Sequence, residues 1–206
     1  MLKEITQLPH TLADRRRITV GLMGGSFNPA HDGHRYVAKT AMKRLRLKEV
    51  WWLVSPQNPL KSRKDMATFA ERVACARTIA RHPRIKVKDI ELHLGTQYTA
   101  DTLATLRLRC PNISFVWIMG ADNLVIFHRW KRWLFIFHTV AIAVFDRPTY
   151  SLSSLASQTA KRFARVRVSD SNLQALAQQK PPAWAFLHTS QYLESSTRIR
   201  AKSKVL

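Results

Sequence analysis

The sequence has few cysteines and lacks a long uninterrupted apolar run. Its 206 residues include two cysteines, Cys75 and Cys110, and neither belongs to a CxxC pair. This excludes a secreted disulfide scaffold, and we interpret both residues as reduced thiols. The most apolar stretch, 133–145, is interrupted by His138 and is too short to span a bilayer. Polar and charged side chains dominate residues 3–17, unlike a signal peptide, so we expect a soluble, cytoplasmic protein without a membrane partner.

Acidic residues are also scarce: 34 Lys and Arg stand against 13 Asp and Glu, a formal net charge of +21. Such a field attracts polyanions, which include nucleotides, nucleic acid and acidic membrane surfaces. The excess equally fits a compositional habit of the source organism, without functional meaning. Apart from Arg15, Arg16 and Arg17 the bases form no long run, so we do not expect a specific nucleic-acid partner.

Short apolar runs alternate with helical patterns, which is typical of a parallel α/β sheet, and hydrophobic residues make up 46% of the chain. The expected strands are 18–23, 50–54, 85–92, 113–118, 140–144, 165–168 and 184–187. The expected helices are 33–47, 68–81 and 99–109, with further helical sequence after residue 122. We therefore predict one doubly wound, Rossmann-like α/β domain over residues 18–206, preceded by a basic N-terminal extension at residues 1–17.

Three polar segments directly follow expected strands, at residues 24–34, 55–65 and 120–122. Ligands of doubly wound sheets bind at the carboxyl ends of the strands, so chemistry is expected in these segments. Gly24 and Gly25 let the backbone turn tightly and approach a ligand closely. The helix start that follows favours an anion through its exposed amides and its dipole. A glycine pair alone also fits a plain turn.

Two histidines in the first segment make the pattern more specific. His31 and His34 are spaced i and i+3, so one helical turn puts both imidazoles on one side, and Gly33 between them leaves room for a ligand. Such imidazoles can donate to phosphate oxygens and stabilise charge on a departing pyrophosphate. Surface histidines or a zinc pair are the alternatives. No HExxH motif or cysteine cluster supports zinc, and we predict no metal site built from protein ligands alone.

The segment 25–34, GSFNPAHDGH, resembles the signature loop of the nucleotidyltransferase superfamily that carries an HxGH element. A second element of that superfamily, SSTxIR before the last helix, is matched by SSTRIR at residues 195–200. There Ser195, Ser196 or Thr197 can cap a helix and present hydroxyls and amides to phosphate, and Arg200 adds a charged fork. Glu194 departs from the superfamily pattern, which has an apolar residue at that position.

Four further segments resemble the bacterial nicotinate-nucleotide adenylyltransferase family. They are Asn28-Pro29, the proline-bracketed loop PQNPLK at 56–61, the YTxDTL element in QYTADTL at 97–103, and GADNL at 120–124 followed by Phe127, Trp130 and Trp133. Together with the first two elements these matches extend from about residue 18 to residue 200. The resemblance implies transfer of an adenylyl group from ATP to nicotinate mononucleotide, giving nicotinate adenine dinucleotide and pyrophosphate in NAD biosynthesis. It also implies Mg²⁺ held mainly by phosphates and water.

The resemblance implies roles for individual residues. His31 and His34 would be catalytic, with His34 near the bond that breaks. The ATP-binding residues would be Gly24, Gly25, Ser26, Phe27, His31, Gly33, His34, Asp122, Ser195, Ser196, Thr197 and Arg200. The substrate-binding residues would be Lys61, Thr99, Trp130 and Arg147. Thr99 would bind the pyridine carboxylate and Trp130 would stack on the pyridine ring, although Trp130 equally fits the core. Thr149 replaces the glycine of the family's RPG turn after Arg147.

The sequence leaves two alternatives open. One is adenylyl transfer to another phosphate acceptor, either nicotinamide mononucleotide or phosphopantetheine. The other is a basic nucleic-acid-binding domain without catalysis, which the +21 charge supports. A homo-oligomer is compatible with the sequence.

Overall fold

The computed structural model describes residues 13–56, 66–147 and 149–189. The strands in these ranges are β1 (Thr19–Gly25), β2 (Glu49–Val54), β3 (Ile85–Lys88), β4 (Ser114–Gly120), β5 (Ala141–Phe145) and β6 (Trp184–Leu187). The α-helices are α1 (Asp32–Arg44), α2 (Phe69–Ala80), α3 (Ile90–His93), α4 (Thr99–Arg109), α5 (Ala121–Ile126), α6 (Trp133–Thr139), α7 (Ser151–Leu155) and α8 (Gln158–Arg162). Three 3₁₀ helices are η3 (Phe127–Arg129), η4 (Ala164–Val166) and η5 (Asp170–Gln178).

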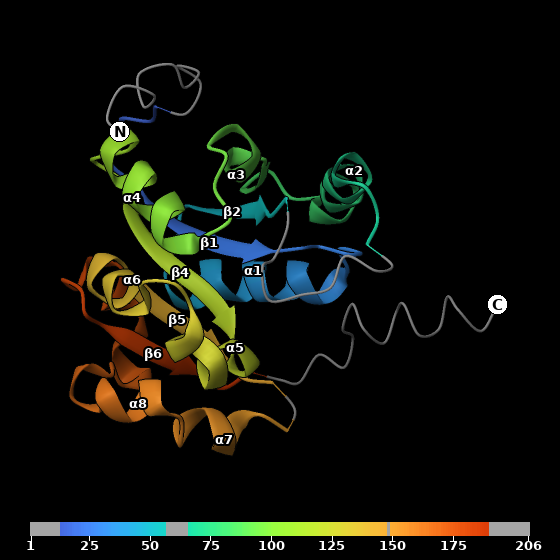
Figure 1. Ribbon diagram of the computed structural model, residues 1–206. Coiled ribbons are helices and arrows are strands. Elements are labelled where there is room, and N and C mark those ends of the chain that lie inside the picture. The colour runs from blue at the N-terminus through green and yellow to red at the C-terminus, as the bar shows by residue number, and fades with distance from the viewer. Residues whose placement is uncertain (1–12, 57–65, 148, 190–206) are drawn as a thin grey trace.

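The strands form one parallel sheet in the order β3-β2-β1-β4-β5-β6. This is the order of a doubly wound Rossmann-like sheet, as predicted. The strand order reverses between β1 and β4, which are neighbours in the sheet (Figure 1). Their carboxyl ends, at Gly25 and Gly120, therefore form the switch point where ligands of such sheets bind.

Two hydrophobic clusters cover the two faces of the sheet. One packs α1, α2 and η5 against residues such as Trp52 and Ile118. The other packs α4, α5, α6 and α8 against residues such as Leu22 and Trp117. Figure 1 shows α4 and α6 next to each other, and the two helices are in contact. Both faces of every central strand are thus buried, which explains why these strands read as continuous apolar runs.

Two of the predicted strands are wrong in part. Residues 85–92 were expected to be one strand, but β3 ends at Lys88 and α3 begins at Ile90. Ile90 packs into the core and Leu92 is half-exposed, so the chain turns away from the sheet there. Residues 165–168 were also expected to be a strand, but residues 165 and 166 lie in the 3₁₀ helix η4, and the segment forms only a single bridge, between Arg167 and Trp184.

Part of the predicted N-terminal extension is attached to the sheet. Arg16 forms ion pairs with Asp14 and Glu49, each at 2.7 Å, and the Asp14 N–H donates to the Arg109 carbonyl at 3.3 Å. Among the described residues, no helix is long and apolar enough to cross a membrane.

Candidate active site

The loop after β1 becomes a helix at the pair of histidines. His31 is the N-cap residue of α1, and its Nδ1 accepts a hydrogen bond from the Gly33 N–H at 3.1 Å. His34 accepts a hydrogen bond at Nδ1 from the His31 N–H at 3.2 Å. The two ring centroids are 3.9 Å apart. This reciprocal cap explains how the i, i+3 spacing brings both imidazoles to one side of the helix start.

The same hydrogen bonds determine the tautomers of the two rings. A neutral imidazole has one N–H and one acceptor nitrogen, and Nδ1 is the acceptor in both rings, so the proton of each neutral ring lies on Nε2. Burial lowers the pKa of His31 to about 4, with the charge of Arg147 as a second cause. His31 is therefore neutral at pH 7, and its Nε2–H can donate to an anionic oxygen.

The side chain of Phe27 packs against the histidine pair. Its backbone has a left-handed φ of 47° and its ring is buried. The ring stacks on Trp52 with a centroid distance of 5.1 Å and contacts the His34 ring at 4.8 Å. The side chain thus belongs to the core and holds His34 in place, which leaves the backbone of Phe27 for any contact with a ligand.

The side chains of Asp122 and Arg147 both lie next to Gly120, at the carboxyl end of β4. Arg147 Nη1 is 3.2 Å from Asp122 Oδ2, and Asp122 Oδ1 is buried without a hydrogen-bond partner among the described residues. Gly120 makes this arrangement possible, because a Cβ at that position would collide with the Asp122 carboxylate and lie 3.0 Å from Arg147 Nε. The charge of Arg147 also acts on His31. Arg147, for which we predicted substrate binding, is not among the residues that line the cavity described next.

A cavity of about 520 Å³ opens beside the ends of β1 and β4. Gly24 has to be glycine here, because a Cβ would lie 2.6 Å from the Trp117 ring. Thr99, at the start of α4, and Trp130 both line the cavity. The Trp130 ring is half-buried and packs against Phe127 and Trp117, at centroid distances of 4.8 Å and 6.2 Å. It therefore belongs to the edge of the core and to the cavity wall at once.

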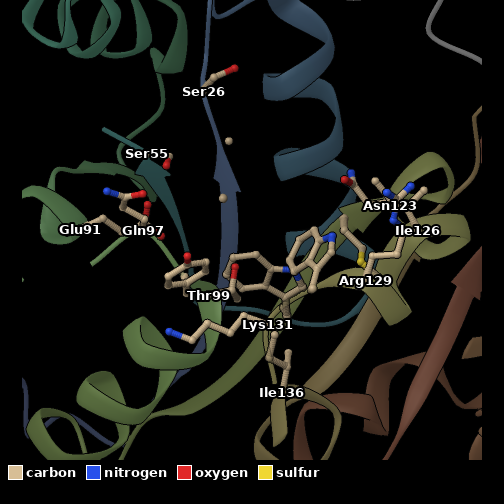
Figure 2. A pocket seen from close by; sticks show the side chains of 16 residues that line it. Ser26, Ser55, Glu91, Gln97, Thr99, Asn123, Ile126, Arg129, Lys131 and Ile136 are labelled. Atoms are coloured by element: carbon tan, nitrogen blue, oxygen red, sulfur yellow. The ribbon is translucent and has the colours of Figure 1, made fainter. Parts of the chain in front are cut away.

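Glu91 is a cavity residue that the sequence analysis did not identify. Figure 2 shows it with Gln97 on one side of the cavity, opposite Asn123 and Arg129. Its carboxylate accepts a hydrogen bond from Thr102 Oγ1 at 3.3 Å and another from the Ser55 side chain. Burial raises the pKa of Glu91, and no ion pair to it occurs among the described residues. Because Glu91 was expected in a strand, its position at the carboxyl edge could not be foreseen.

The structure brings most of the predicted site residues together at the switch point. The end of β1 supplies Gly24 and Gly25 to the cavity wall, Ser26 follows them there, and the histidine pair lies at the start of α1. The predicted residues outside the described ranges are Lys61, Ser195, Ser196, Thr197 and Arg200, together with Glu194. Among the described residues, no group of three His, Cys, Asp or Glu side chains could hold a metal ion.

The site can be compared with known proteins. The family model described as cytidylyltransferase-like matches residues 22–202. A relative from Rhizobium johnstonii is 49% identical over 193 residues, which cover 94% of this chain and 96% of the relative. Another, from Cereibacter sphaeroides, is 51% identical over 187 residues, which cover 91% and 99%. Both are named "Probable nicotinate-nucleotide adenylyltransferase".

A solved structure, described as "Plasmodium falciparum nicotinic acid mononucleotide adenylyltransferase complexed with NaAD", matches with a TM-score of 0.67. It is 19% identical in sequence, and the match covers 89% of this chain and 83% of that one. At this identity the likeness supports the fold alone. The sequence relatives and the family model go further: the chain belongs to the cytidylyltransferase-like family and, within it, to the nicotinate-nucleotide adenylyltransferases, which are nucleotidyltransferase enzymes.

Proposed function

We propose that the enzyme transfers the adenylyl group of ATP to nicotinate mononucleotide in NAD biosynthesis. The observation that carries the proposal is the pair of capping imidazoles at the start of α1, next to a cavity walled by Thr99 and Trp130. A volume of about 520 Å³ is in the range of small-molecule sites. The relatives named above support the choice of acceptor.

In the proposed reaction, an oxygen of the mononucleotide phosphate attacks the α-phosphorus of ATP in line with the leaving group. The bond from the α-phosphorus to the α,β-bridging oxygen breaks, and pyrophosphate departs with those electrons. The attacking phosphate is already ionised at neutral pH, so no general base is needed. Catalysis then consists of positioning and of stabilising charge on the transferred and departing phosphates.

The histidines would supply that stabilisation. His31 is neutral, so it would act as a hydrogen-bond donor through Nε2–H and not as a general acid. His34, whose Nδ1 is also an acceptor, would donate through Nε2–H near the bond that breaks. Gly24, Gly25 and Ser26 lie at the carboxyl end of β1 and lead into the loop before α1, whose N-terminal dipole favours phosphate. Asp122 and Arg147 would lie at the ATP side, since the charge of Arg147, which pairs with Asp122, acts on His31.

Thr99 and Trp130 would form the acceptor side of the site. The exposed part of the Trp130 ring would stack on the pyridine ring, and Thr99 at the start of α4 would bind the pyridine carboxylate. Lys61 would neutralise phosphate charge. Ser195, Ser196, Thr197 and Arg200 would hold the triphosphate from the C-terminal segment, as their match to the SSTxIR element implies.

Magnesium would enter as part of the ATP substrate. The described residues provide no carboxylate cluster for a site built by the protein alone, and Mg²⁺ prefers phosphate and water oxygens in such reactions. We propose a cytoplasmic location, because the reaction uses ATP and neither Cys75 nor Cys110 forms a disulfide with another described residue. Assembly into a homo-oligomer stays a prediction.

The test is a pyrophosphate-release assay with MgATP and three acceptors: nicotinate mononucleotide, nicotinamide mononucleotide and phosphopantetheine. We expect kcat/KM to be highest with nicotinate mononucleotide. A large preference for nicotinamide mononucleotide would contradict the assigned acceptor but would still support adenylyl transfer as the reaction. Release with none of the three would contradict the function itself.

A further inference from the structure

Arg72 is a buried charged residue that the reaction as described does not use. It lies in α2, on the face that also buries Val73, Ala76 and Ala80, and only 2% of its surface is exposed. Among the described residues, no carboxylate lies within ion-pair distance of its guanidinium. Burying a charge without an opposite charge is unfavourable, so a specific arrangement of partners has to hold it there.

Four backbone carbonyls provide that arrangement. Arg72 Nη1 donates to the carbonyls of Ser26 and Ser55, both at 2.7 Å. Nη2 donates to the Pro56 carbonyl at 3.0 Å, and Nε donates to the Ala67 carbonyl at 3.1 Å. One planar guanidinium thus joins the segments that follow β1 and β2 to the start of α2. These are two of the loops at the carboxyl edge of the sheet, where the proposed chemistry takes place.

The bond to Ser26 has a consequence for the neighbouring amide. In a planar trans peptide the carbonyl of one residue and the N–H of the next point in opposite directions. The Ser26–Phe27 bond is not among the cis peptides of the chain. Because Arg72 holds the Ser26 carbonyl, it turns the Phe27 N–H away from α2. The left-handed φ of Phe27, 47°, then leads the chain on towards the histidines.

The positive charge of Arg72 also favours binding of an anion at this loop. Its pKa is lowered by burial, but a guanidinium stays protonated in proteins. The four carbonyls accept from four of its five N–H donors and leave its full positive charge uncompensated by any described carboxylate. In a poorly solvated setting that charge favours an anion near Ser26, and carbonyl lone pairs that would repel such an anion are turned towards the guanidinium.

We propose that Arg72 is a positioning residue for adenylyl transfer: it orients the Ser26–Phe27 peptide so that its N–H faces the polyphosphate. The inference rests on the proposed function, since it assumes that the loop after β1 binds the triphosphate. It also links that loop to the cavity, because Ser55 accepts from Arg72 through its carbonyl and donates to Glu91 through its side chain.

The test compares Arg72→Lys and Arg72→Ala with a control on the same helix, Arg77→Met, whose side chain is exposed. Lysine keeps the charge, but its single nitrogen cannot reproduce the fork that reaches Ser26 and Pro56 at once. We expect kcat of Arg72→Lys to fall at least about tenfold, and KM for the mononucleotide to change less than about threefold. Arg77→Met should retain wild-type kinetics.

Arg72→Ala separates positioning from folding. We expect its kcat to fall about 100-fold or more and to recover at least about tenfold when guanidinium chloride is added at non-denaturing concentration. Sodium chloride at equal ionic strength should give no recovery, and melting temperatures show which variants are folded. A folded Arg72→Lys enzyme with kcat within about threefold of Arg77→Met would overturn the proposal, whether or not Arg72→Ala folds. Wild-type turnover reports separately on the proposed function, because the inference concerns only the ratio of variant to wild type.

Discussion

The His31 ring has two roles that amide side chains can separate. Its Nδ1 caps α1 by accepting from the Gly33 N–H at 3.1 Å, and its Nε2–H is the proposed donor to the triphosphate. The Oδ1 of asparagine takes approximately the place of Nδ1, so His31→Asn keeps the cap and loses the donor. The Nε2 of glutamine takes approximately the place of the imidazole Nε2, so His31→Gln keeps the donor and loses the cap.

The two variants should therefore fail in opposite ways. Asparagine is among the best N-cap residues, so His31→Asn should change the free energy of unfolding by less than about 1 kcal/mol. Loss of a donor aimed at developing charge lowers kcat by about 100- to 1,000-fold, which corresponds to about 3–4 kcal/mol. His31→Gln should lose about 0.5–2 kcal/mol of stability with the cap. Its kcat should exceed that of His31→Asn by at least about tenfold, because an N–H remains.

Pyrophosphate release gives kcat, and urea titration gives the free energy of unfolding for each variant. His34 and the rest of the loop are unchanged in both variants, so each serves as the control for the other. A His31→Asn enzyme that keeps more than about a tenth of wild-type kcat would refute the role of the Nε2 donor. A His31→Gln enzyme less active than His31→Asn would refute the tautomer assignment.

Three other predictions follow from the site and the fold. Because the pKa of His31 is lowered to about 4, the unfolded chain binds more protons than the folded one between about pH 4 and 6.5, so stability should rise with pH in that window and not above it. Urea titrations should show that His31→Asn removes at most about 3 kcal/mol of this rise, and an unchanged profile would contradict the buried neutral imidazole. Trp130→Ala should raise KM for nicotinate mononucleotide about tenfold and leave KM for ATP within about twofold, whereas Trp130→Phe should stay close to wild type; equal effects on both substrates would contradict the stacking role. Thr149 has a left-handed φ of 72°, so Thr149→Gly should relieve strain and stabilise the fold by about 0.5–1 kcal/mol, and a lower melting temperature would refute this.

The sequence was sufficient to predict part of the fold. The helix 99–109 was predicted with the boundaries that α4 has, and the α/β alternation gave the correct sheet type. The prediction at 85–92 was wrong because the alternation of apolar residues shifts between Val87 and Ile90. That shift marks the end of β3, and a prediction based only on the alternation of apolar and polar residues does not detect it.

Parts of the site were predictable for a similar reason. The spacing of His31 and His34 is local, and one helical turn is enough to bring the two rings together. Arg72 was missed because its partners Ser26, Ser55 and Pro56 lie 46, 17 and 16 residues away in the chain. A signal existed, since Arg72 interrupts the apolar stripe of α2, but only the folded sheet shows which carbonyls it meets.

The capping geometry also explains why histidine suits both positions in this loop. A serine or aspartate at position 31 would cap α1 equally well, because either accepts from the Gly33 N–H. Neither side chain would also place a donor towards the triphosphate as the imidazole does, and aspartate would add negative charge facing it. An imidazole accepts at Nδ1 and donates at Nε2, so the bond that starts the helix also aims the donor. Folding of the helix N-terminus and preparation of the phosphate site are therefore one event in this protein.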